Sequence, residues 1–484
     1  MSSLAFTQSR KNLALALLAL TQFVIVLDAS IVNVALPSIG SALDFSQDNL
    51  SWVVNAYTLT FGGFLLLGGR LADLLGRRAI FMAGLGLFSV ASLLGGLAQS
   101  DTWLIAARAA QGLGAALISP AALSLVTTIF SEGAERNRAL GVWGAVAGSG
   151  GAAGVLLGGV LTQWVGWEAV LFVNVPIGVL AAAAAPRLLP ESRDAGHRYF
   201  DFQGAVLVTG GLALLVYALV DANNAGWGTF HTIGLGAIAL GLLAVFVAWE
   251  SRAKHPLMPF SIFRLQTLRG ANVIGLLIGL SLFAMFFFLS LYMQQVLGYD
   301  ALKTGVSYLP LALMIIVSAG VASQFTTRIG FKPVLITGML MLAGGLVWFA
   351  QVDAGGSYIS DVLFPSIVVG FGLGLAFVSV TIAAVMGTKP DEAGLASGLI
   401  NTSQQVGGAL GLGILSAIAT ARTTHVAAGH SHGFALTAGF QTAFLVGAGF
   451  ALLAAVLAAV MISSADSRAH AEAAQAGEVA PAAA

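Results

Sequence analysis

Two ionisable side chains interrupt long apolar runs of the sequence, Asp28 within residues 12–36 and Arg108 within residues 102–124. A carboxylate can bind and release a proton, whereas an Arg side chain stays charged in proteins. A charge in hydrocarbon costs on the order of 2.5 to 3.5 kcal/mol on insertion scales, so each side chain should face a polar cavity or a partner. At 1.5 Å per helical residue, both lie roughly 9 to 12 Å from the ends of their runs on one side of a membrane. The pattern predicts a proton-binding site at this pair, and a fixed ion pair that only orients two helices is the alternative.

Neutral polar and aromatic side chains in the apolar runs can line a binding cavity. Amide and hydroxyl groups can hydrogen-bond a ligand, although bonds between neighbouring helices explain any single one of them about as well. Aromatic rings offer contact area to a lipophilic ligand, although lipid-facing positions explain many of them. The predicted substrate cavity contains Asn33, Asn55, Tyr57, Gln111, Phe283, Phe287, Tyr292, Asn401 and Gln405.

Glycines recur every three or four residues along the run 138–162, so they fall on one face of a helix. A neighbouring helix can approach such a face to backbone distance. The run 393–421 repeats the spacing, which indicates an internal repeat. We predict that five of these glycines take part in conformational gating: Gly144, Gly148, Gly151, Gly154 and Gly158.

A short charged loop joins the runs 49–69 and 79–99. Asp73 and Arg77 are four residues apart, a spacing at which an acid and a base pair on a helix, and charge that only sets topology is the alternative. A weaker version of the same loop recurs at residues 327–332. The predicted gating residues of the loop are Gly69, Asp73, Gly76, Arg77 and Arg78.

The composition indicates a polytopic membrane protein. Of 484 residues, 58% are hydrophobic and 9% are charged, against about 25% charged residues in soluble domains. A net charge of zero gives no global attraction to nucleic acid. The chain has no P-loop for ATP, no H-E-x-x-H motif, no cysteine and no nucleophile with a base inside a span. We therefore predict no enzyme activity, catalytic residue, cofactor, metal site or nucleic-acid partner.

A helix needs roughly 20 apolar residues to cross the hydrocarbon of a bilayer. Such runs lie near residues 12–36, 49–69, 79–99, 102–124, 138–162, 168–189, 202–220, 230–250, 270–296, 301–325, 333–351, 357–386, 393–421 and 437–463. If the chain starts in the cytoplasm, the loops on that side hold every Lys and Arg outside the spans except Lys303 and Arg422. This asymmetry follows the positive-inside rule. We predict an all-α membrane protein with 14 transmembrane helices and both termini cytoplasmic.

The charged linkers divide the runs into six, two and six. We predict an N-terminal six-helix bundle over residues 1–200, two inserted transmembrane helices over 201–268 and a C-terminal six-helix bundle over 269–463. Residues 464–484 mix small and polar residues without apolar periodicity, which predicts a disordered cytoplasmic tail. Two echoing blocks of helices are typical of transporters.

These motifs resemble the major facilitator superfamily and, within it, the fourteen-span drug:proton antiporters of the multidrug efflux type. Residues 27–37 are similar to the first-helix motif of that group, with Ser30 where Thr is usual. Residues 108–116 match the fourth-helix motif, and the resemblance implies that Arg108 takes part in proton transfer.

The other two motifs resemble the family with one departure each. The loop 69–78 is similar to the motif between the second and third helices, which implies that Asp73 and Arg77 help to lock the outward-facing state, but Leu74 replaces a usual basic residue. The glycine face resembles the antiporter motif of the fifth helix, with Val155 in the place of a usual proline.

The predicted function is proton-coupled export of lipophilic drugs or antibiotic-like compounds by alternating access. The expected partners are a lipophilic small molecule, protons and membrane lipid, and we expect a monomer in a bacterial inner membrane. A proton-coupled uptake symporter and an exporter of one specific metabolite or lipid are the alternatives. A channel is disfavoured because no ring of like groups is visible.

Overall fold

The computed structural model of the 484-residue chain describes residues 8–130, 134–192, 201–226, 228–253, 256, 260–388 and 393–475. All secondary structure in these ranges is helical. The first part contains α1 Gln8–Ala42, α2 Gln47–Leu50, α3 Trp52–Leu75, α4 Arg77–Gly96, α5 Asp101–Ile129, α6 Ala134–Trp164, α7 Ala169–Phe172, α8 Asn174–Leu188, α9 Phe202–Ala225 and α10 Phe230–Glu250. The second part contains η1 Phe260–Arg264, α11 Gln266–Leu291, η2 Tyr292–Val296, α12 Ala301–Ser307, α13 Leu309–Ile329, α14 Phe331–Phe349, η3 Tyr358–Leu363, α15 Phe364–Val385, α16 Ala393–Ala427, α17 His432–Met461 and α18 Ser464–Gln475.

Polar caps begin several of these helices. Ser100 accepts a hydrogen bond from the backbone N–H of Trp103 at the start of α5, and Ser431 does the same for Phe434 at the start of α17. Such a cap satisfies one of the backbone donors that the first turn of a helix leaves free. Local sequence therefore sets where these apolar helices begin. Their packing depends on the side chains along the rest of each helix.

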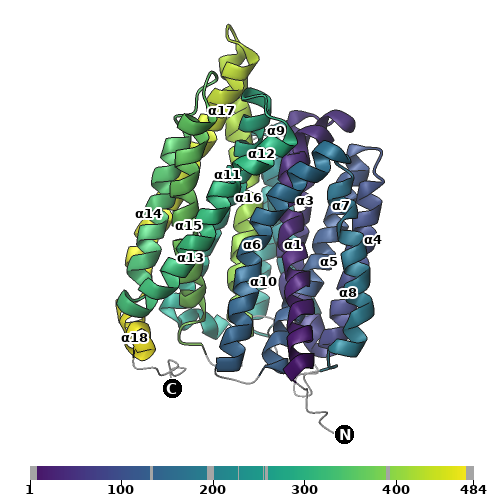
Figure 1. The fold of residues 1–484 in the computed structure, drawn as a ribbon, viewed down its shortest axis with the longest axis vertical. Helices are drawn as coiled ribbons and strands as arrows, with labels where there is room; N and C mark the ends of the chain where they lie inside the picture. Colours follow the sequence, from purple (N-terminus) through teal and green to yellow (C-terminus); the bar gives the residue numbers. More distant parts are fainter. Residues whose placement is uncertain are drawn as a thin grey trace.

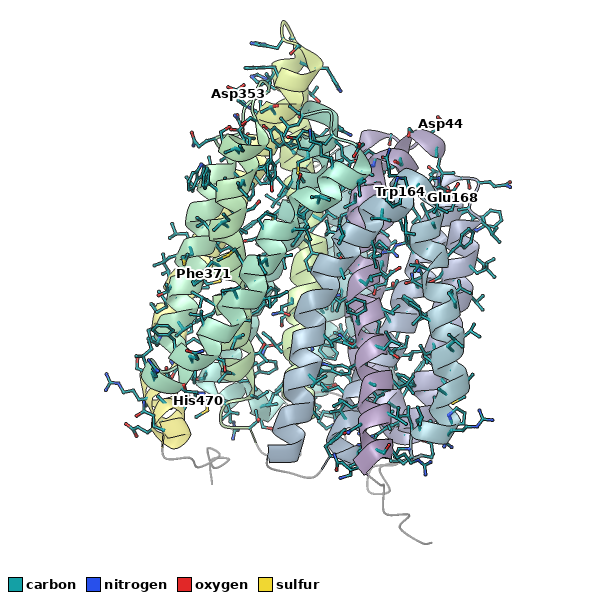
Figure 2. The ribbon with its side chains drawn as sticks, viewed as in Figure 1. Asp44, Trp164, Glu168, Asp353, Phe371 and His470 are labelled. Carbon is teal, nitrogen blue, oxygen red and sulfur yellow. The ribbon has the colours of Figure 1, made fainter. Side chains whose placement is uncertain are left out.

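The long helices stand side by side along the vertical axis of Figure 1. We call the end at which α1 begins the base and the opposite end the top. The C-terminal helix α18 also lies at the base (Figure 1). Among the labelled side chains of Figure 2, Asp44, Glu168 and Asp353 lie at the top and His470 lies at the base.

Two sets of helices repeat one packing pattern. In the first set (α1–α8, here the N-half), α1 packs on α6, α3 and α4 pack on α5, and α4 packs on α8. In the second set (α11–α17, the C-half), α11 packs on α16, α13 and α14 pack on α15, and α14 packs on α17. The internal repeat predicted from sequence is therefore present in the structure.

Twelve helical segments of the described residues are long and apolar enough to cross a membrane. They include α9 and α10, and they coincide with 12 of the predicted runs. The other two runs form α3, of 24 residues, and α6, of 31 residues, which are not among these twelve segments of the described residues. The predicted count of 14 spans stays a prediction.

The inserted pair α9 and α10 is attached along one side. Helix α9 packs on α3 of the N-half and α16 of the C-half, and the Thr209 hydroxyl donates to the Gly63 carbonyl at 2.8 Å. Helix α10 packs on α9, and most of its surface is exposed. Helix α9 thus touches both halves.

The predicted disorder of residues 464–484 is wrong for its first part, because residues 464–475 form α18. The Ser467 hydroxyl accepts from the backbone N–H of Lys332 at 3.0 Å, and Gln475 Nε2 donates to the carbonyls of Thr327 and Arg328. His470 lies edge-on against the ring of Phe331. An Ala-rich polar segment forms a helix here because the loop between α13 and α14 supplies partners for it. Residues 476–484 lie outside the described part of the chain.

Candidate functional site

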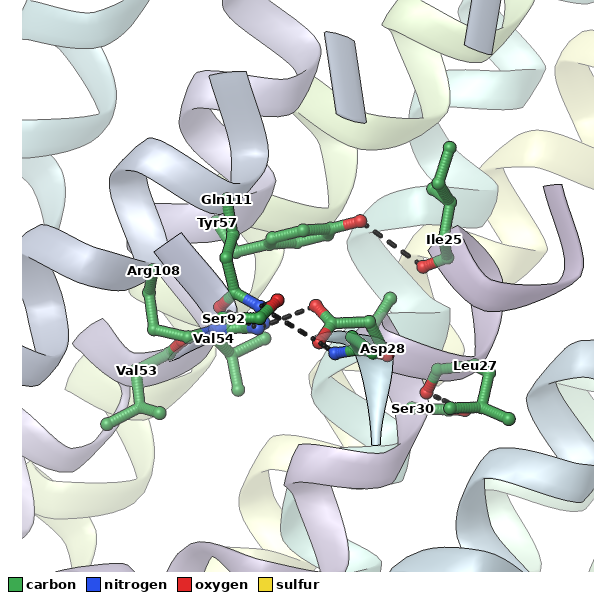
Figure 3. Close-up of polar contacts among 12 residues, drawn as sticks. Ile25, Leu27, Asp28, Ser30, Val53, Val54, Tyr57, Ser92, Arg108 and Gln111 are labelled. Carbon is green, nitrogen blue, oxygen red and sulfur yellow. Dashed lines mark hydrogen bonds and ion pairs between the residues drawn. The ribbon is translucent and has the colours of Figure 1, made fainter. Parts of the chain in front are cut away.

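The two ionisable side chains of the apolar runs meet in the N-half. Arg108 of α5 donates from Nη1 to Asp28 Oδ2 of α1 at 2.6 Å, and both side chains are essentially inaccessible to solvent. Figure 3 shows Arg108, Gln111 and Tyr57 approaching Asp28 from one side. The predicted contact between the two residues is confirmed, and their role in proton coupling stays a prediction.

Two neutral amides complete the shell around the Asp28 carboxylate. Gln111 Nε2, one turn along α5 from Arg108, donates to Asp28 Oδ1 at 3.3 Å and to Ser92 Oγ of α4 at 2.6 Å. Asn174 Nδ2, at the first residue of α8, donates to the same Oδ1 at 2.7 Å. The carboxylate therefore accepts from three side chains on two other helices.

The Arg108 guanidinium is held from several directions. Its Nε donates to the Val53 carbonyl of α3 at 3.0 Å, and its Nη1 also contacts Gln111 Oε1 at 2.9 Å. The guanidinium carbon lies 4.4 Å from the centre of the Tyr57 ring, within reach of a cation–π interaction. The Tyr57 hydroxyl donates to the Ile25 carbonyl. These contacts fix the cation beside Asp28 without using its remaining nitrogen.

Several polar atoms of this region are buried without a hydrogen-bond partner among the described residues. They are Arg108 Nη2, Asn174 Oδ1, Asn33 Oδ1 and both side-chain amide atoms of Asn55. A buried polar group that forms no hydrogen bond is costly, and such groups gather at sites that bind water, an ion or a ligand. These atoms are available to bond water, an ion or a ligand.

The other predicted cavity residues of the N-half lie close to this cluster in sequence or in space. Asn33 and Asn55 are buried, and Asn33 Nδ2 donates to the Ala29 carbonyl of its own helix. Tyr57 and Gln111 are part of the cluster itself. The structure thus brings Asp28, Arg108, Tyr57 and Gln111 together.

The predicted cavity residues of the C-half do not join them. Phe287 is packed in the apolar core against Phe288, and the Tyr292 hydroxyl bonds Asp361 and the Asp353 carbonyl near the top. Phe283 and Gln405 are half-buried, and Asn401 is exposed. Their shared role in one cavity stays a prediction.

The glycine helix α6 presents glycines to two different neighbours. A Cβ atom at Gly154 would overlap Ser30 Oγ of α1 and lie 2.7 Å from the Leu27 carbonyl, and one at Gly158 would lie 2.6 Å from the Ile31 carbonyl. The predicted approach to backbone distance is confirmed at these two positions. It does not hold at Gly151, where a Cβ would meet nothing within 4 Å. Gly144 and Gly148 fall among positions whose surroundings lie outside the described residues.

Gly151 faces a small apolar cavity between the two halves. The cavity holds about 40 Å³ and is lined by α6, by Phe286 of α11 and by residues of α13. Above it the halves touch, because a Cβ at Gly305 of α12 would lie 2.8 Å from the Val155 carbonyl. Gln294 Nε2 also donates to the Val34 carbonyl of α1 at 3.0 Å.

The charged loop of the N-half is held by hydrogen bonds to two neighbouring segments. Gly76 has φ 116°, a conformation that favours glycine, and it ends α3 and begins α4. The Arg78 backbone N–H donates to Glu191 Oε1 at 3.2 Å, and Arg77 Nη1 donates to Thr128 Oγ1 at 2.6 Å. The predicted pairing of Arg77 with Asp73 lies outside the description, because the Asp73 side chain is not among the described ones. Gly69 packs against the ring of Pro120.

The second loop has the same construction. Gly330 has φ 84° between α13 and α14, and the next residue but one, Lys332, donates its backbone N–H to Ser467. In each half, a segment that follows the last long helix caps the helix after this glycine. The repeat of the loop predicted from sequence is confirmed at the level of backbone geometry.

Sequence reasoning missed Asn174 and Ser92. Both contact the cluster, yet each is a small polar residue in an apolar helix, a pattern that occurs wherever helices bond each other. The available signal was that Asn174 lies in a run with no other polar side chain between Glu168 and Arg187.

Comparison with known proteins agrees with this geometry. The sequence model of the Major Facilitator Superfamily matches residues 18–412. The chain is 38% identical to the puromycin resistance protein of Streptomyces alboniger over 94% of this chain and 92% of that protein. It is 42% identical to the cephamycin export protein of Amycolatopsis lactamdurans over 86% of each chain.

Solved structures share the fold at low sequence identity. A bacterial homologue of the human lysosomal transporter Spinster has a TM-score of 0.65 at 14% identity, covering 96% of this chain and 99% of that one. The human organic anion transporter MFSD10 has a TM-score of 0.63 at 16% identity, covering 93% and 99%.

The fold and the helical repeat define a membrane transporter. The chain belongs to the major facilitator superfamily. It is a multi-pass protein of the bacterial inner membrane, and its relatives include antibiotic and multidrug exporters.

Proposed function

We propose that the protein is a proton-coupled antiporter that exports lipophilic, antibiotic-like small molecules by alternating access. The observation that carries this proposal is the buried contact between Asp28 and Arg108. Within the cluster, Arg108 keeps its charge and the amides stay neutral, so Asp28 is the carboxyl group that can change charge with the proton. One buried carboxyl is the simplest basis for one proton per cycle.

Protonation of Asp28 changes the contacts of α1, and α1 carries the change to the glycine helix. Neutralising the carboxylate weakens its attraction to Arg108. Ser30, two residues from Asp28, packs directly on Gly154 of α6, and α6 meets α12 of the C-half near the top. A movement of α1 would therefore displace α6 and change its contact with α12 of the C-half. Rocking of two six-helix blocks requires such a coupling between the halves. The charged loop would control opening of the transporter at the base, through Gly69, Asp73, Gly76, Arg77 and Arg78.

The proposed substrate is lipophilic because the candidate cavity combines amides with aromatic rings. The named relatives resist or export puromycin and cephamycin, which supports a small-molecule substrate of antibiotic type. Asn33, Asn55, Tyr57 and Gln111 would offer hydrogen bonds from the N-half. Phe283, Phe287, Tyr292, Asn401 and Gln405 would line the C-half when the halves part.

We further propose 14 spans with the base in the cytoplasm and with N-terminal, inserted and C-terminal units at 1–200, 201–268 and 269–463. The lengths of α3 and α6, about 36 and 46 Å at 1.5 Å per residue, support two spans beyond the 12. The positive charge of the base loops supports the orientation. The protein acts as a monomer in contact with lipid and catalyses no covalent chemistry.

Transport by everted membrane vesicles tests this function. Vesicles that contain the protein should accumulate a lipophilic antibiotic when their lumen is acidified, and collapse of the pH gradient should stop accumulation. Vesicles that carry the Asp28→Asn variant serve as the matched control. Accumulation that ignores the pH gradient would contradict proton coupling, and gradient-driven loss of the compound from the lumen would indicate a symporter.

A further inference from the structure

We propose that the side-chain amide of Asn174 rotates when Asp28 is protonated. In the structure its Nδ2 donates to Asp28 Oδ1 at 2.7 Å. In the protonated state the amide turns by half a rotation and its Oδ1 accepts from the new Asp28 O–H. Asn174 is thus a positioning residue for the proton, and this inference rests on the proposed proton coupling.

The need for an acceptor follows from the inventory around Asp28. The three side chains that bond the carboxylate all act as donors. A protonated carboxyl has an O–H donor of its own, and it cannot donate this proton to Arg108, which has no acceptor atom. If nothing in the shell changed, the buried proton would have no partner, and a buried polar group without a partner is costly.

Gln111 is poorly suited to supply that acceptor. Its Oε1 already accepts from Arg108 Nη1 at 2.9 Å, and its Nε2 donates to Ser92 Oγ at 2.6 Å. Turning this amide would place its NH₂ group against the guanidinium, donor against donor, and would break the bond to Arg108. Gln111 is therefore held in one orientation by its neighbours.

Asn174 has no such restraint. Its Oδ1 is buried and has no hydrogen-bond partner among the described residues, and its Nδ2 bonds Asp28. A half turn exchanges these two atoms and breaks no bond other than the one to Asp28. The exchange matches the change in Asp28, because the amide donates to the carboxylate and accepts from the carboxylic acid.

The backbone places Asn174 at a break in the helix. Helix α7 ends at Phe172, Val173 forms a turn, and Asn174 is the first residue of α8. Helix α8 packs on α1 and α4, and Asn174 bonds Oδ1 of Asp28, whereas Arg108 bonds Oδ2. Arg108 and Asn174 can thus act on the carboxylate independently.

Infrared difference spectroscopy on the full chain in lipid, with ¹³C-labelled asparagine, tests the turn directly. Between neutral and acid pH, an asparagine carbonyl band should shift with the same midpoint as the protonation of Asp28. The shift should vanish in Asp28→Asn and Asn174→Leu and persist in Asn272→Leu, a buried amide of the C-half that bonds Leu268 and Ser403. A shift that persists in Asn174→Leu, or the absence of any asparagine shift in the wild type, would overturn the proposal.

Transport kinetics give a second reading that a purely structural role would not produce. Asn174→Leu should lower the maximal rate of gradient-driven export by about tenfold, the factor that follows loss of one bond to a charged group. The half-saturating substrate concentration should stay within about twofold, because the amide acts on the proton. Asn174→Ser should recover part of the rate, since a hydroxyl both donates and accepts.

The two proposals fail differently. Gradient-driven export by Asp28→Asn would defeat the proton-coupled function as a whole. A different outcome would defeat only the role of Asn174. In that outcome Asp28→Asn loses export, Asn174→Leu exports at the wild-type rate, and the labelled wild type shows no band shift from Asn174. If Asn174→Leu does not fold, the labelled wild type compared with Asp28→Asn and Asn174→Ser still decides the question.

Discussion

The N-half and the C-half share one helix arrangement but differ in what they bury. The N-half encloses Asp28 and Arg108 with two amides, whereas no described buried side chain of α11–α17 is Asp, Glu, Lys, Arg or His. At the core of the C-half lie aromatic contacts such as Phe288 with Phe440 and Phe349 with Phe444. The repeat therefore packs well without an ion pair.

This difference argues that the charges of the N-half are not there to hold the fold. A buried ion pair gains little net stability over well-packed apolar residues, because both charges lose their hydration. The C-half has the same helix arrangement, and its described buried side chains include no charged residue. In the proposed function, the N-half gains a group that can bind a proton in exchange for the desolvation of Asp28.

The largest expected effect comes from making the N-half core as apolar as that of the C-half. The double variant Asp28→Leu with Arg108→Met should insert and fold, with a stability within about 2 kcal/mol of the wild type, but it should not export. Arg108→Met alone should lose about 3 to 5 kcal/mol near neutral pH, since it leaves a buried carboxylate without its cation. Denaturation in detergent with a transport assay separates these outcomes. A double variant less stable than both single variants would mean that the pair is structural.

A smaller effect is expected where α6 touches α1. Gly154→Ala should destabilise the N-half by about 1 to 3 kcal/mol and slow export, because the new methyl group overlaps Ser30. Gly151→Ala, one turn away, meets no atom within 4 Å and is the matched control. Thermal unfolding and export rates of the two variants check this. Equal behaviour of both would show that contact between α6 and α1 does not matter for transport.

The hydrogen bonds that cap α4 and α14 should contribute similarly to stability, although one acceptor is a carboxylate and the other a hydroxyl. Glu191→Ala removes the side chain that accepts from Arg78, and Ser467→Ala removes the one that accepts from Lys332. Each should cost about 0.5 to 1.5 kcal/mol. Hydrogen exchange should speed up in the first turn of α4 for the former and of α14 for the latter. Unchanged exchange in either helix would break the equivalence of the two hydrogen bonds.

The smallest effect concerns the pH response of α18, which has no counterpart in the described residues after α8. Burial against Phe331 lowers the pKa of His470 below its usual value. Above about pH 6.5 the imidazole is neutral whether α18 is docked or free, and below that pH the free form takes up the proton first. Docking should therefore weaken as the pH falls, seen as faster amide exchange in α18. His470→Phe should remove this pH dependence, and an unchanged profile in that variant would contradict the assignment.

Sequence patterns predicted the features that depend on local composition. Apolar runs located the helices, and the charges at residues 28 and 108 were expected to pair because hydrocarbon leaves a charge few alternatives. The glycine that joins α3 to α4 and its counterpart at residue 330 were found because the loop repeats.

Other features depend on partners that are distant in sequence. Asn174 is 146 residues from Asp28, and a lone amide in an apolar run does not reveal its partner. The segment of α18 looks like a polar tail until the loop at residues 327–332 is placed beside it. The face of α6 was predicted as uniform, but Gly151 and Gly154 face different surroundings because two helices from different halves approach it.

The most direct test of the account is exchange of protons for substrate by the purified protein in liposomes. The wild type should move protons against a lipophilic antibiotic when a pH gradient is imposed, and a pH-sensitive dye should record proton movement that depends on the compound. The Asp28→Asn variant should be folded and should show neither flux. Wild-type proton flux and gradient-driven transport in Asp28→Asn would contradict the account, because the proton would then bind elsewhere.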